Sequence, residues 1–481
     1  MSGSSPEPSP QPQRPSSPQQ PSASQPQPRP PAAASAELDE QAALERFRAL
    51  LRIPTISRLE VDAVEWQNFD DFVATVEQLY PALHAGLERE LVAGHTLLFR
   101  WRGLDDTGAA SVLMAHYDVV AATDEGWEHQ PFSAELTGSG SGRVLWGRGT
   151  LDDKGSVVSI LEAVERAVAA GFTPAHDVYL LFGHDEETHG TGAETAARLL
   201  RERGVEIGLV LDEGGAVVEG VIPTVERPIA VVGVSEKGTT SFSLTVEQSG
   251  GHASTPPRVT ASDRLARAIV RLNTHPFPAR LNSVTETMIR TVGAHARNPL
   301  RFVFVRARFF RPLLVAVFGR LGVDTAAMVR TTTAVTQLSG GLAANALPER
   351  VQATVNVRIA IGSSVKATKA RLARIIDDPA VQIGVLSSGE PARVSHMNGP
   401  RWELLKAAIE AGYPDAVVTP YVQTGATDSR QFSPVSRSVY RFSPFEMTGE
   451  ERSTLHAKNE RMRVQTWFTG IRFFDGLLRN L

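Results

Sequence analysis

The sequence predicts a two-domain α/β protein, in which an α+β domain is inserted into an α/β domain with a mostly parallel sheet. Three observations predict this fold. About 440 residues follow a polar N-terminal stretch, more than one hydrophobic core usually organises. Over residues 41–235, short apolar runs alternate with helical patterns, as in βα units. From Glu236 onward, strands of alternating polarity with intervening helices are typical of an antiparallel sheet covered on one face.

The N-terminal residues 1–40 are predicted to form a disordered tail. Residues 1–36 are mainly Pro, Ser, Gln and Ala without apolar periodicity, so they cannot bury a core. They lack the apolar stretch of a signal peptide and the Arg-rich amphipathic pattern of a transit peptide. No later apolar run reaches the length of a membrane span. We therefore expect a cytoplasmic protein without a transmembrane segment, and the sequence leaves secretion open.

The larger domain is predicted to be discontinuous, with residues 41–235 and 391–481 flanking an inserted domain of residues 236–390. Its buried parallel strands are expected in the apolar runs 112–115, 178–182 and 209–211. A helix is expected where Val157, Ile160, Leu161, Val164 and Val168 share one face. In the inserted domain, alternation predicts strands at residues 241–246 and 351–359.

Acidic residues and histidines recur where the predicted strands end. The candidates at strand ends are His116, Glu187 and Asp212, with Glu186 beside Glu187; Asp152 lies between the first two apolar runs, and His456 comes late in the chain. Side chains at the carboxyl ends of parallel strands meet in one crevice. Imidazole and carboxylate suit zinc, and the chain has no cysteine to offer instead. Any one of these residues alone is more often a cap or turn residue, but the whole set favours a metal site.

The charge balance indicates the class of ligand. With 49 basic and 53 acidic residues, the chain has no excess of positive charge for a nucleic-acid partner. A small-molecule enzyme fits this composition better.

Several motifs resemble one known family across about residues 41–481. They are Met114-Ala-His-Tyr-Asp118, Gly147-Arg-Gly-Thr-Leu-Asp-Asp-Lys-Gly155, Gly183-His-Asp-Glu-Glu187, Ser249-Gly-Gly-His-Ala-Ser254 and His456. The family comprises the zinc-dependent metallopeptidases that include aminoacylase, carboxypeptidase G, acetylornithine deacetylase and succinyl-diaminopimelate desuccinylase. The resemblance implies an enzyme that hydrolyses linear amide or peptide bonds, with the inserted domain as a lid and dimerisation domain.

The resemblance also implies the role of each metal-site residue. Asp152 would bridge two zinc ions, for which Co²⁺ or Mn²⁺ can substitute. His116 and Asp212 would complete one ion's ligands, and Glu187 and His456 the other's.

Two further features of this centre are carried over from the family. Glu186 would be the general base for a metal-bridged water, and Asp118 would orient His116. A cis peptide is implied between Asp152 and Asp153; the alternative is an ordinary trans bond.

The resemblance places the remaining site residues mostly in the lid. His252 would stabilise the oxyanion, in several relatives from the lid of a second subunit, so a homodimer is open. Arg358 would grip a substrate carboxylate, with Asn345, Gly425 and Thr427 as weaker candidates for the same pocket. The alternatives are a loop histidine, a solvated strand arginine and simple turns.

A narrower resemblance points to the branch that synthesises and hydrolyses N-fatty-acyl amino acids. It depends on Val234-Ser-Glu-Lys-Gly238, Arg330-Thr-Thr-Thr-Ala334 and Thr427-Asp-Ser-Arg430. We therefore expect an N-acyl amino acid as substrate. The alternative is a di-zinc carboxypeptidase or dipeptidase on short peptides. An inactive binding protein of the same fold fits less well, because all five ligands and the base are present.

Residues 298–321 are both apolar and basic. Phenylalanine, leucine and valine alternate there with five arginines. Such a segment could line an acyl channel or rest on an anionic membrane surface, or its apolar face could pack on its own sheet. Pro312 is expected to bend or restart the helix.

Overall fold

The computed structural model describes residues 1–3, 37–220 and 224–481. The predicted disordered tail, residues 1–40, falls mainly on residues 4–36, which lie outside the described part. In the described ranges, no helix combines the length and apolarity needed to cross a bilayer.

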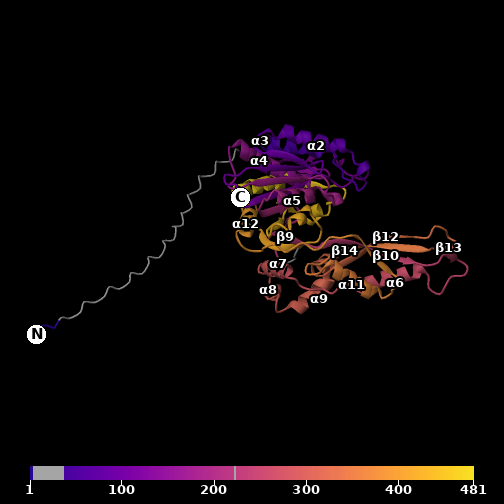
Figure 1. Cartoon of the computed structure of the whole chain (residues 1–481). Coiled ribbons are helices and arrows are strands. Elements are labelled where there is room, and N and C mark those ends of the chain that lie inside the picture. The colour runs from indigo at the N-terminus through magenta and orange to yellow at the C-terminus, as the bar shows by residue number, and fades with distance from the viewer. Residues whose placement is uncertain (4–36, 221–223) are drawn as a thin grey trace.

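The chain forms two bodies, and the α/β fold class is confirmed (Figure 1). The larger body is built on a ten-stranded sheet with the order β1-β2-β6-β3-β7-β17-β9-β8-β18, in which β16 also pairs with β9. These strands are β1 (Glu88–Val92), β2 (Thr96–Trp101), β3 (Ala110–His116), β6 (Val178–Gly183), β7 (Ile207–Asp212), β8 (Val217–Val218), β9 (Ile229–Glu236), β16 (Val417–Gln423), β17 (Val439–Arg441) and β18 (Glu446–Met447). A three-stranded sheet combines β4 (Glu135–Thr137), β5 (Val144–Trp146) and β19 (Arg461–Arg463).

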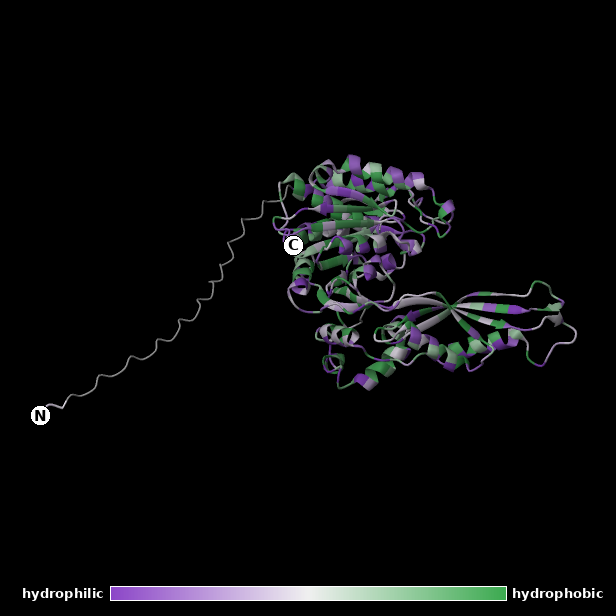
Figure 2. Ribbon diagram, in the orientation of Figure 1, coloured by the Kyte–Doolittle hydropathy of each residue, from purple (hydrophilic) through white to green (hydrophobic). Residues whose placement is uncertain are grey.

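The centre of the large sheet is parallel and buried. Strands β6, β3, β7 and β17 run in the same direction. Every residue of β3 and β6 is buried, as continuous apolar runs predict for a parallel sheet covered on both faces. Figure 2 shows these central strands largely in the hydrophobic colour.

Helices cover both faces of this sheet. Helix α4 packs on β3 together with α1 and α14, and α5 packs on the other face beside the 3₁₀ helix η4. The helices of this body are α1 (Glu40–Leu51), α2 (Trp66–Leu79), α3 (Pro81–Gly86), α4 (Lys154–Ala169), α5 (Gly192–Glu202), α12 (Pro400–Gly412), α13 (Gly449–Arg452) and α14 (Val464–Leu478). Short 3₁₀ turns are η1 (Val61–Ala63), η2 (Gly140–Gly142), η3 (Glu186–Thr188) and η4 (Asp428–Phe432).

The inserted domain is an antiparallel sheet of order β12-β14-β10-β15 with helices on one face. Alternate residues of β14 are buried, so the sheet turns one face to α6 and α11. Its elements are β10 (Gly238–Glu247), β11 (Gly251–His252), β12 (Thr332–Gly340), β13 (Ala346–Leu347), β14 (Arg350–Ile359), β15 (Gln382–Ser387), α6 (Ala261–Thr274), α7 (Ser283–Gly293), α8 (Leu300–Val305), α9 (Arg311–Leu321), α10 (Val323–Val329) and α11 (Val365–Ile376).

The two connections between the bodies run side by side. Strand β9 ends at Glu236 and β10 begins at Gly238. On the return, Ala392 donates its backbone N–H to Glu236 O at 3.1 Å, and Ser395 donates to Val234 O at 2.7 Å. We call these two adjacent connections, residues 234–238 and 392–395, the hinge. They fix where the inserted domain joins the large sheet.

The apolar and basic segment does not pack on its own sheet. Helices α8 to α10 instead bury a small cluster against α7, formed by Leu281, Ile289, Ala307, Leu314 and Val329. Helix α8 ends at Val305 and α9 begins at Arg311. Pro312 lies in the first turn of α9, where its missing N–H costs no helical hydrogen bond. The expected helix restart is therefore confirmed.

Candidate metal centre

The carboxylate of Asp152 lies between two imidazoles. His116 Nε2 is 3.0 Å from Asp152 Oδ1, and His456 Nε2 is 2.8 Å from Asp152 Oδ2. His456 Nε2 is also 3.2 Å from Glu187 Oε2. Ligand atoms of His116, Asp152 and Glu187 lie within 4.8 Å of one another. Each oxygen of Asp152 therefore faces a different histidine, an arrangement that suits a carboxylate shared by two cations.

The strand ends explain why these side chains meet. His116 is the last residue of β3, and η3, which holds Glu186 and Glu187, follows β6. His116 and Gly183 are register partners in this parallel pair, so both loops leave the sheet at the same level. Asp152 lies two residues before α4, whose N-cap is Asp153, and the bond between Asp152 and Asp153 is cis, as the resemblance implied.

Asp212 is held by a contact outside the group formed by His116, Asp152 and Glu187. It is the last residue of β7, and its Oδ2 accepts the backbone N–H of Ser429 at 2.8 Å. Among the described residues it has no hydrogen bond or ion pair with His116, Asp152, Glu187 or His456. Its charge nevertheless raises the pKa of neighbouring carboxyl groups at the centre, after the larger effect of burial.

Asp118 connects His116 with the loop that carries Glu186 and Glu187. Its Oδ1 lies 3.3 Å from His116 Nδ1, on the opposite side of the imidazole from Asp152. The same carboxylate accepts the backbone N–H groups of Glu186 at 3.2 Å and Glu187 at 3.1 Å. Because Asp118 is fully buried, it orients the His116 ring and ties the β3 loop to the β6 loop.

The centre carries more buried negative charge than its protein partners balance. Both oxygens of Asp153 and Oε1 of Glu187 are buried without a hydrogen-bond partner among the described residues. Burial raises the pKa of Asp153, Glu186, Glu213 and Asp428 well above their ordinary values. Buried carboxylates without donors are costly unless a cation compensates them. The residues therefore fit bound metal ions.

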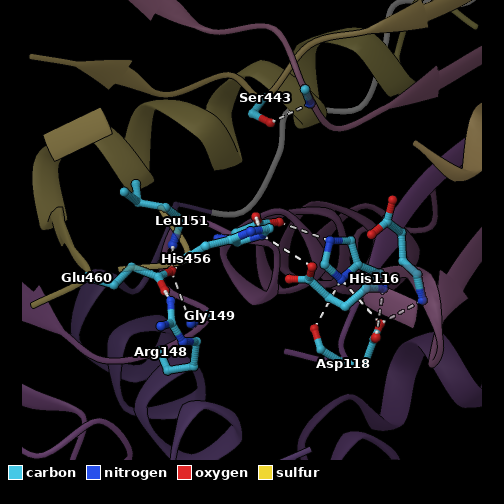
Figure 3. A network of polar contacts seen from close by, with 12 residues as sticks. His116, Asp118, Arg148, Gly149, Leu151, Ser443, His456 and Glu460 are labelled. Atoms are coloured by element: carbon cyan, nitrogen blue, oxygen red, sulfur yellow. Dashed lines mark hydrogen bonds and ion pairs between the residues drawn. The ribbon is translucent and has the colours of Figure 1, made fainter. Parts of the chain in front are cut away.

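Glu460 is a functional residue that sequence reasoning missed. Its fully buried carboxylate accepts the backbone N–H groups of Gly149, Leu151 and Asp152 at 3.0, 2.8 and 3.2 Å. Its other oxygen pairs with Arg148 at 2.5 Å. Figure 3 shows Arg148, Gly149 and Leu151 beside this side chain. Glu460 thus sets the position of the loop that presents Asp152; its place four residues after His456 was the available signal.

Two arginines and one histidine lie near one another at the hinge. Arg358, half-buried on β14, donates from Nη1 to Thr239 Oγ1 at 2.8 Å. Burial, and then the charge of Arg430, lowers the pKa of Arg358. Burial, and then Arg430 and Arg358, lowers the pKa of His189, which follows η3. In the described chain, neither arginine has an ion-pair partner, so this group can receive an anion. In the sequence, Arg430 was identified only as the end of the 427–430 motif, and His189 was not predicted to take part.

The loop candidates at the hinge have different surroundings. Thr427 is buried, and its N–H and hydroxyl both donate to Glu236 Oε2, at 3.1 and 3.3 Å. Thr427 therefore anchors the loop that leads to Arg430. Gly425 is partly exposed in the same loop, and a Cβ there would meet only Gln423 Nε2, at 3.9 Å.

His252 and Asn345 lie together at the far tip of the inserted domain. His252 on β11 pairs with Ala346 on β13, and Ala253 donates its N–H to Asn345 O at 3.0 Å. Figure 1 places β13 at the end of the domain remote from the large sheet. The His252 ring is exposed and, within the part of the chain that the structure describes, hydrogen-bonds only to Ser254. Within one chain, the structure does not bring these two residues to the metal centre.

Comparison with known proteins agrees with this arrangement. The chain is 34% identical over 449 residues to the human N-fatty-acyl-amino acid synthase/hydrolase PM20D1, covering 92% of this chain and 88% of that protein. It is 34% identical to the probable carboxypeptidase S-like 2 of Dictyostelium discoideum, covering 86% and 79%.

A solved structure shows the same two-domain fold. The M20 family metallo-carboxypeptidase Sso-CP2 of Sulfolobus solfataricus aligns with a TM-score of 0.66 at 18% identity, covering 91% of this chain and 98% of that one. Residues 112–480 match Peptidase family M20/M25/M40. The chain therefore belongs to this metallopeptidase family and is a hydrolase.

Proposed function

We propose that this protein is a di-zinc amidohydrolase that cleaves, and in reverse forms, the amide bond of N-acyl amino acids. One observation carries the proposal: the Asp152 carboxylate offers one oxygen to each of two histidines beside buried, uncompensated acids. The similarity to PM20D1 supports the choice of substrate.

The donor set divides into two halves around Asp152. His116 and Asp212 would hold one ion with Asp152, and Glu187 and His456 the other. Co²⁺ or Mn²⁺ would be accepted by the same nitrogen and oxygen ligands. Bound zinc ions would supply Lewis acidity to the amide carbonyl and acidify a water.

Glu186 performs the proton transfers in this proposal. Its carboxyl group is nearly buried beside the ligand Glu187, and Asp118 fixes its backbone. As water oxygen bonds to the amide carbon, Glu186 accepts the water's proton. When the C–N bond breaks, the proton passes to the leaving nitrogen. The products are the fatty acid and the free amino acid.

The hinge cations would select the amino-acid end of the substrate. The free α-carboxylate would pair with Arg358, whose planar guanidinium offers two parallel donors. Arg430 would add positive potential at the same place, and the ring of His189, kept neutral by its lowered pKa, could donate one N–H. Gly425 leaves room there, since it has no side chain.

The remote tip of the inserted domain supports a homodimer. His252 and Asn345 cannot act on their own chain's metal centre in this arrangement, so the partner subunit would supply the oxyanion-stabilising histidine. The chain would then bind a second copy of itself and a small-molecule substrate.

The base is tested by Glu186→Gln, which keeps the size of the side chain but cannot accept a proton. We expect turnover to fall on the order of a hundredfold or more, with metal content unchanged by elemental analysis. Near-normal turnover with intact metal would remove Glu186 from this role.

The substrate is tested with one amino acid carrying acyl chains from acetyl to oleoyl. Rising catalytic efficiency with chain length supports the proposal, and excess fatty acid and amino acid should yield conjugate. Arg358→Gln should raise KM for the free acid but not for its carboxamide. A flat series, with dipeptides preferred, would favour the carboxypeptidase or dipeptidase function suggested by the Dictyostelium relative.

A further inference from the structure

Helices α8 and α9 carry an exposed surface that is apolar and basic together, here called the α8–α9 face. Its apolar members are exposed by 39 to 80%, and they are Phe302, Val305, Phe309, Leu313 and Val317. Its basic members, all exposed, are Arg301, Arg306, Arg308, Arg311 and Arg320. From Leu300 to Leu321, which covers both helices and the residues between them, only Ala307 and Leu314 are buried. The small cluster against α7 thus leaves most of the face without a partner.

The segment that carries these arginines has few acidic residues. Residues 297–330 contain seven arginines and one acidic residue, Asp324, in a chain whose net charge is −4. Across the described ranges, none of the five arginines of the face forms an ion pair. Where they make contacts, these are to carbonyls or rings: the guanidinium of Arg306 lies 4.3 Å from the ring centre of Phe302, and Arg311 donates to Leu281 O.

We propose that the α8–α9 face docks on an anionic lipid bilayer. A bilayer surface offers negative headgroups to the arginines and, directly beneath them, acyl chains to Phe302, Phe309 and Leu313. The alternation of the two residue types along short helices matches this layered chemistry.

Other partners match only one half of the face. A nucleic acid would pair with the arginines but leave the leucine and valine side chains exposed. A second copy of the chain, docked through the same face, would bring five arginines against five others, which is electrostatically unfavourable.

The position of the face leaves the metal centre free. In Figure 1, α8 and α9 lie at the lower edge of the inserted domain, on the side away from the large sheet. Docking there covers neither the hinge nor the β11–β13 tip. The inference does not depend on which substrate the metal centre takes.

The test is flotation of the full-length protein with vesicles of phosphatidylcholine, with and without about one third phosphatidylglycerol. We expect binding to the anionic vesicles only, and weaker binding as salt rises, because the Debye length shortens. The double variant Arg308→Glu with Phe309→Ser should lower the partition coefficient about tenfold or more, since one basic residue near the surface contributes about a factor of five.

The chain provides a matched control in Arg58 and Leu59. This exposed pair on the larger body repeats the sequence order, and Leu59 is 79% exposed against 80% for Phe309. Arg58→Glu with Leu59→Ser should bind vesicles like the wild type. A milder variant, Arg301→Gln with Arg320→Gln, repeats the test without changing any apolar residue.

Three results would overturn the proposal. The first is equal binding to neutral and anionic vesicles, and the second is an equal loss of vesicle binding in the α8–α9 and control variants. The third is self-association in sedimentation that the Arg308 and Phe309 changes abolish while vesicle binding persists. The last result would assign the face to a second copy of the chain.

Discussion

Replacing Glu460 by Gln tests the inference that a buried carboxylate positions the Asp152 loop. In the wild type, one oxygen accepts three backbone N–H groups and the other pairs with Arg148. Side-chain exposure in this pair is 0% for Glu460 and 3% for Arg148. An amide cannot serve both sides, because its NH₂ group would face either the guanidinium or the backbone donors.

The expected loss is large because the pair is buried. Removing one partner of a buried ion pair costs about 3 to 5 kcal/mol of unfolding free energy. Since Asp152 depends on this loop, zinc affinity should also fall about 10- to 100-fold, as for other residues that orient metal ligands. Urea unfolding of the chelator-treated protein measures the first effect, and competitive zinc titration measures the second.

Glu450 provides the control for this substitution. Its pair with Arg461 has the same 2.5 Å separation, but Glu450 is 80% exposed. Glu450→Gln should therefore cost only about 0 to 1 kcal/mol and leave zinc affinity unchanged. Hydrogen exchange at Gly149 and Leu151 should accelerate in the Glu460 variant alone. Equal effects of the two substitutions on stability, exchange and zinc affinity would refute the positioning role.

Three other predictions concern the metals, the dimer and the hinge. Elemental analysis should find about two ions per active chain, and Asp152→Ala should release both; full activity with a single ion would contradict the shared carboxylate. The His252→Ala and Glu186→Gln variants should each be inactive. Mixtures of the two that are refolded together should regain activity, because one site of the mixed dimer then combines an intact Glu186 with the partner's intact histidine. Mixtures that stay inactive would contradict a shared site. Burial, and then Arg358, lowers the pKa of Lys237 from 10.5 to about 8. Between these pH values the unfolded chain binds a proton that the folded chain lacks, so wild-type stability should rise with pH relative to Lys237→Met, by about 3 kcal/mol in total; parallel stability curves would show that Lys237 is not so perturbed.

The strands and the residues at their ends could be predicted from the sequence. The apolar runs before His116, Glu186 and Asp212 became β3, β6 and β7, because a strand buried on both faces needs a continuous apolar sequence. Parallel strands end at one edge of the sheet, so the convergence of these loops followed from the pattern alone. The alternation of β14 likewise showed its single buried face.

Contacts between distant segments were decided only by the tertiary structure. Glu460 and Gly149 are 311 residues apart in sequence, and nothing local distinguishes a carboxylate that will bind backbone N–H groups from a solvated one. The same holds for Arg430, whose proximity to Arg358 depends on two chain crossings at the hinge.

The placement of the inserted domain could not be predicted from the sequence either. A Gly-Gly-His turn indicates a loop but not its distance from the metal centre, which depends on how far the antiparallel pair of β10 and β14 extends. For residues 298–321, the apolar pattern showed that helices form, yet not which of their faces the protein covers. Local sequence determines secondary structure and strand ends, because these depend on near neighbours, whereas the partners of a side chain depend on the packing of the whole chain.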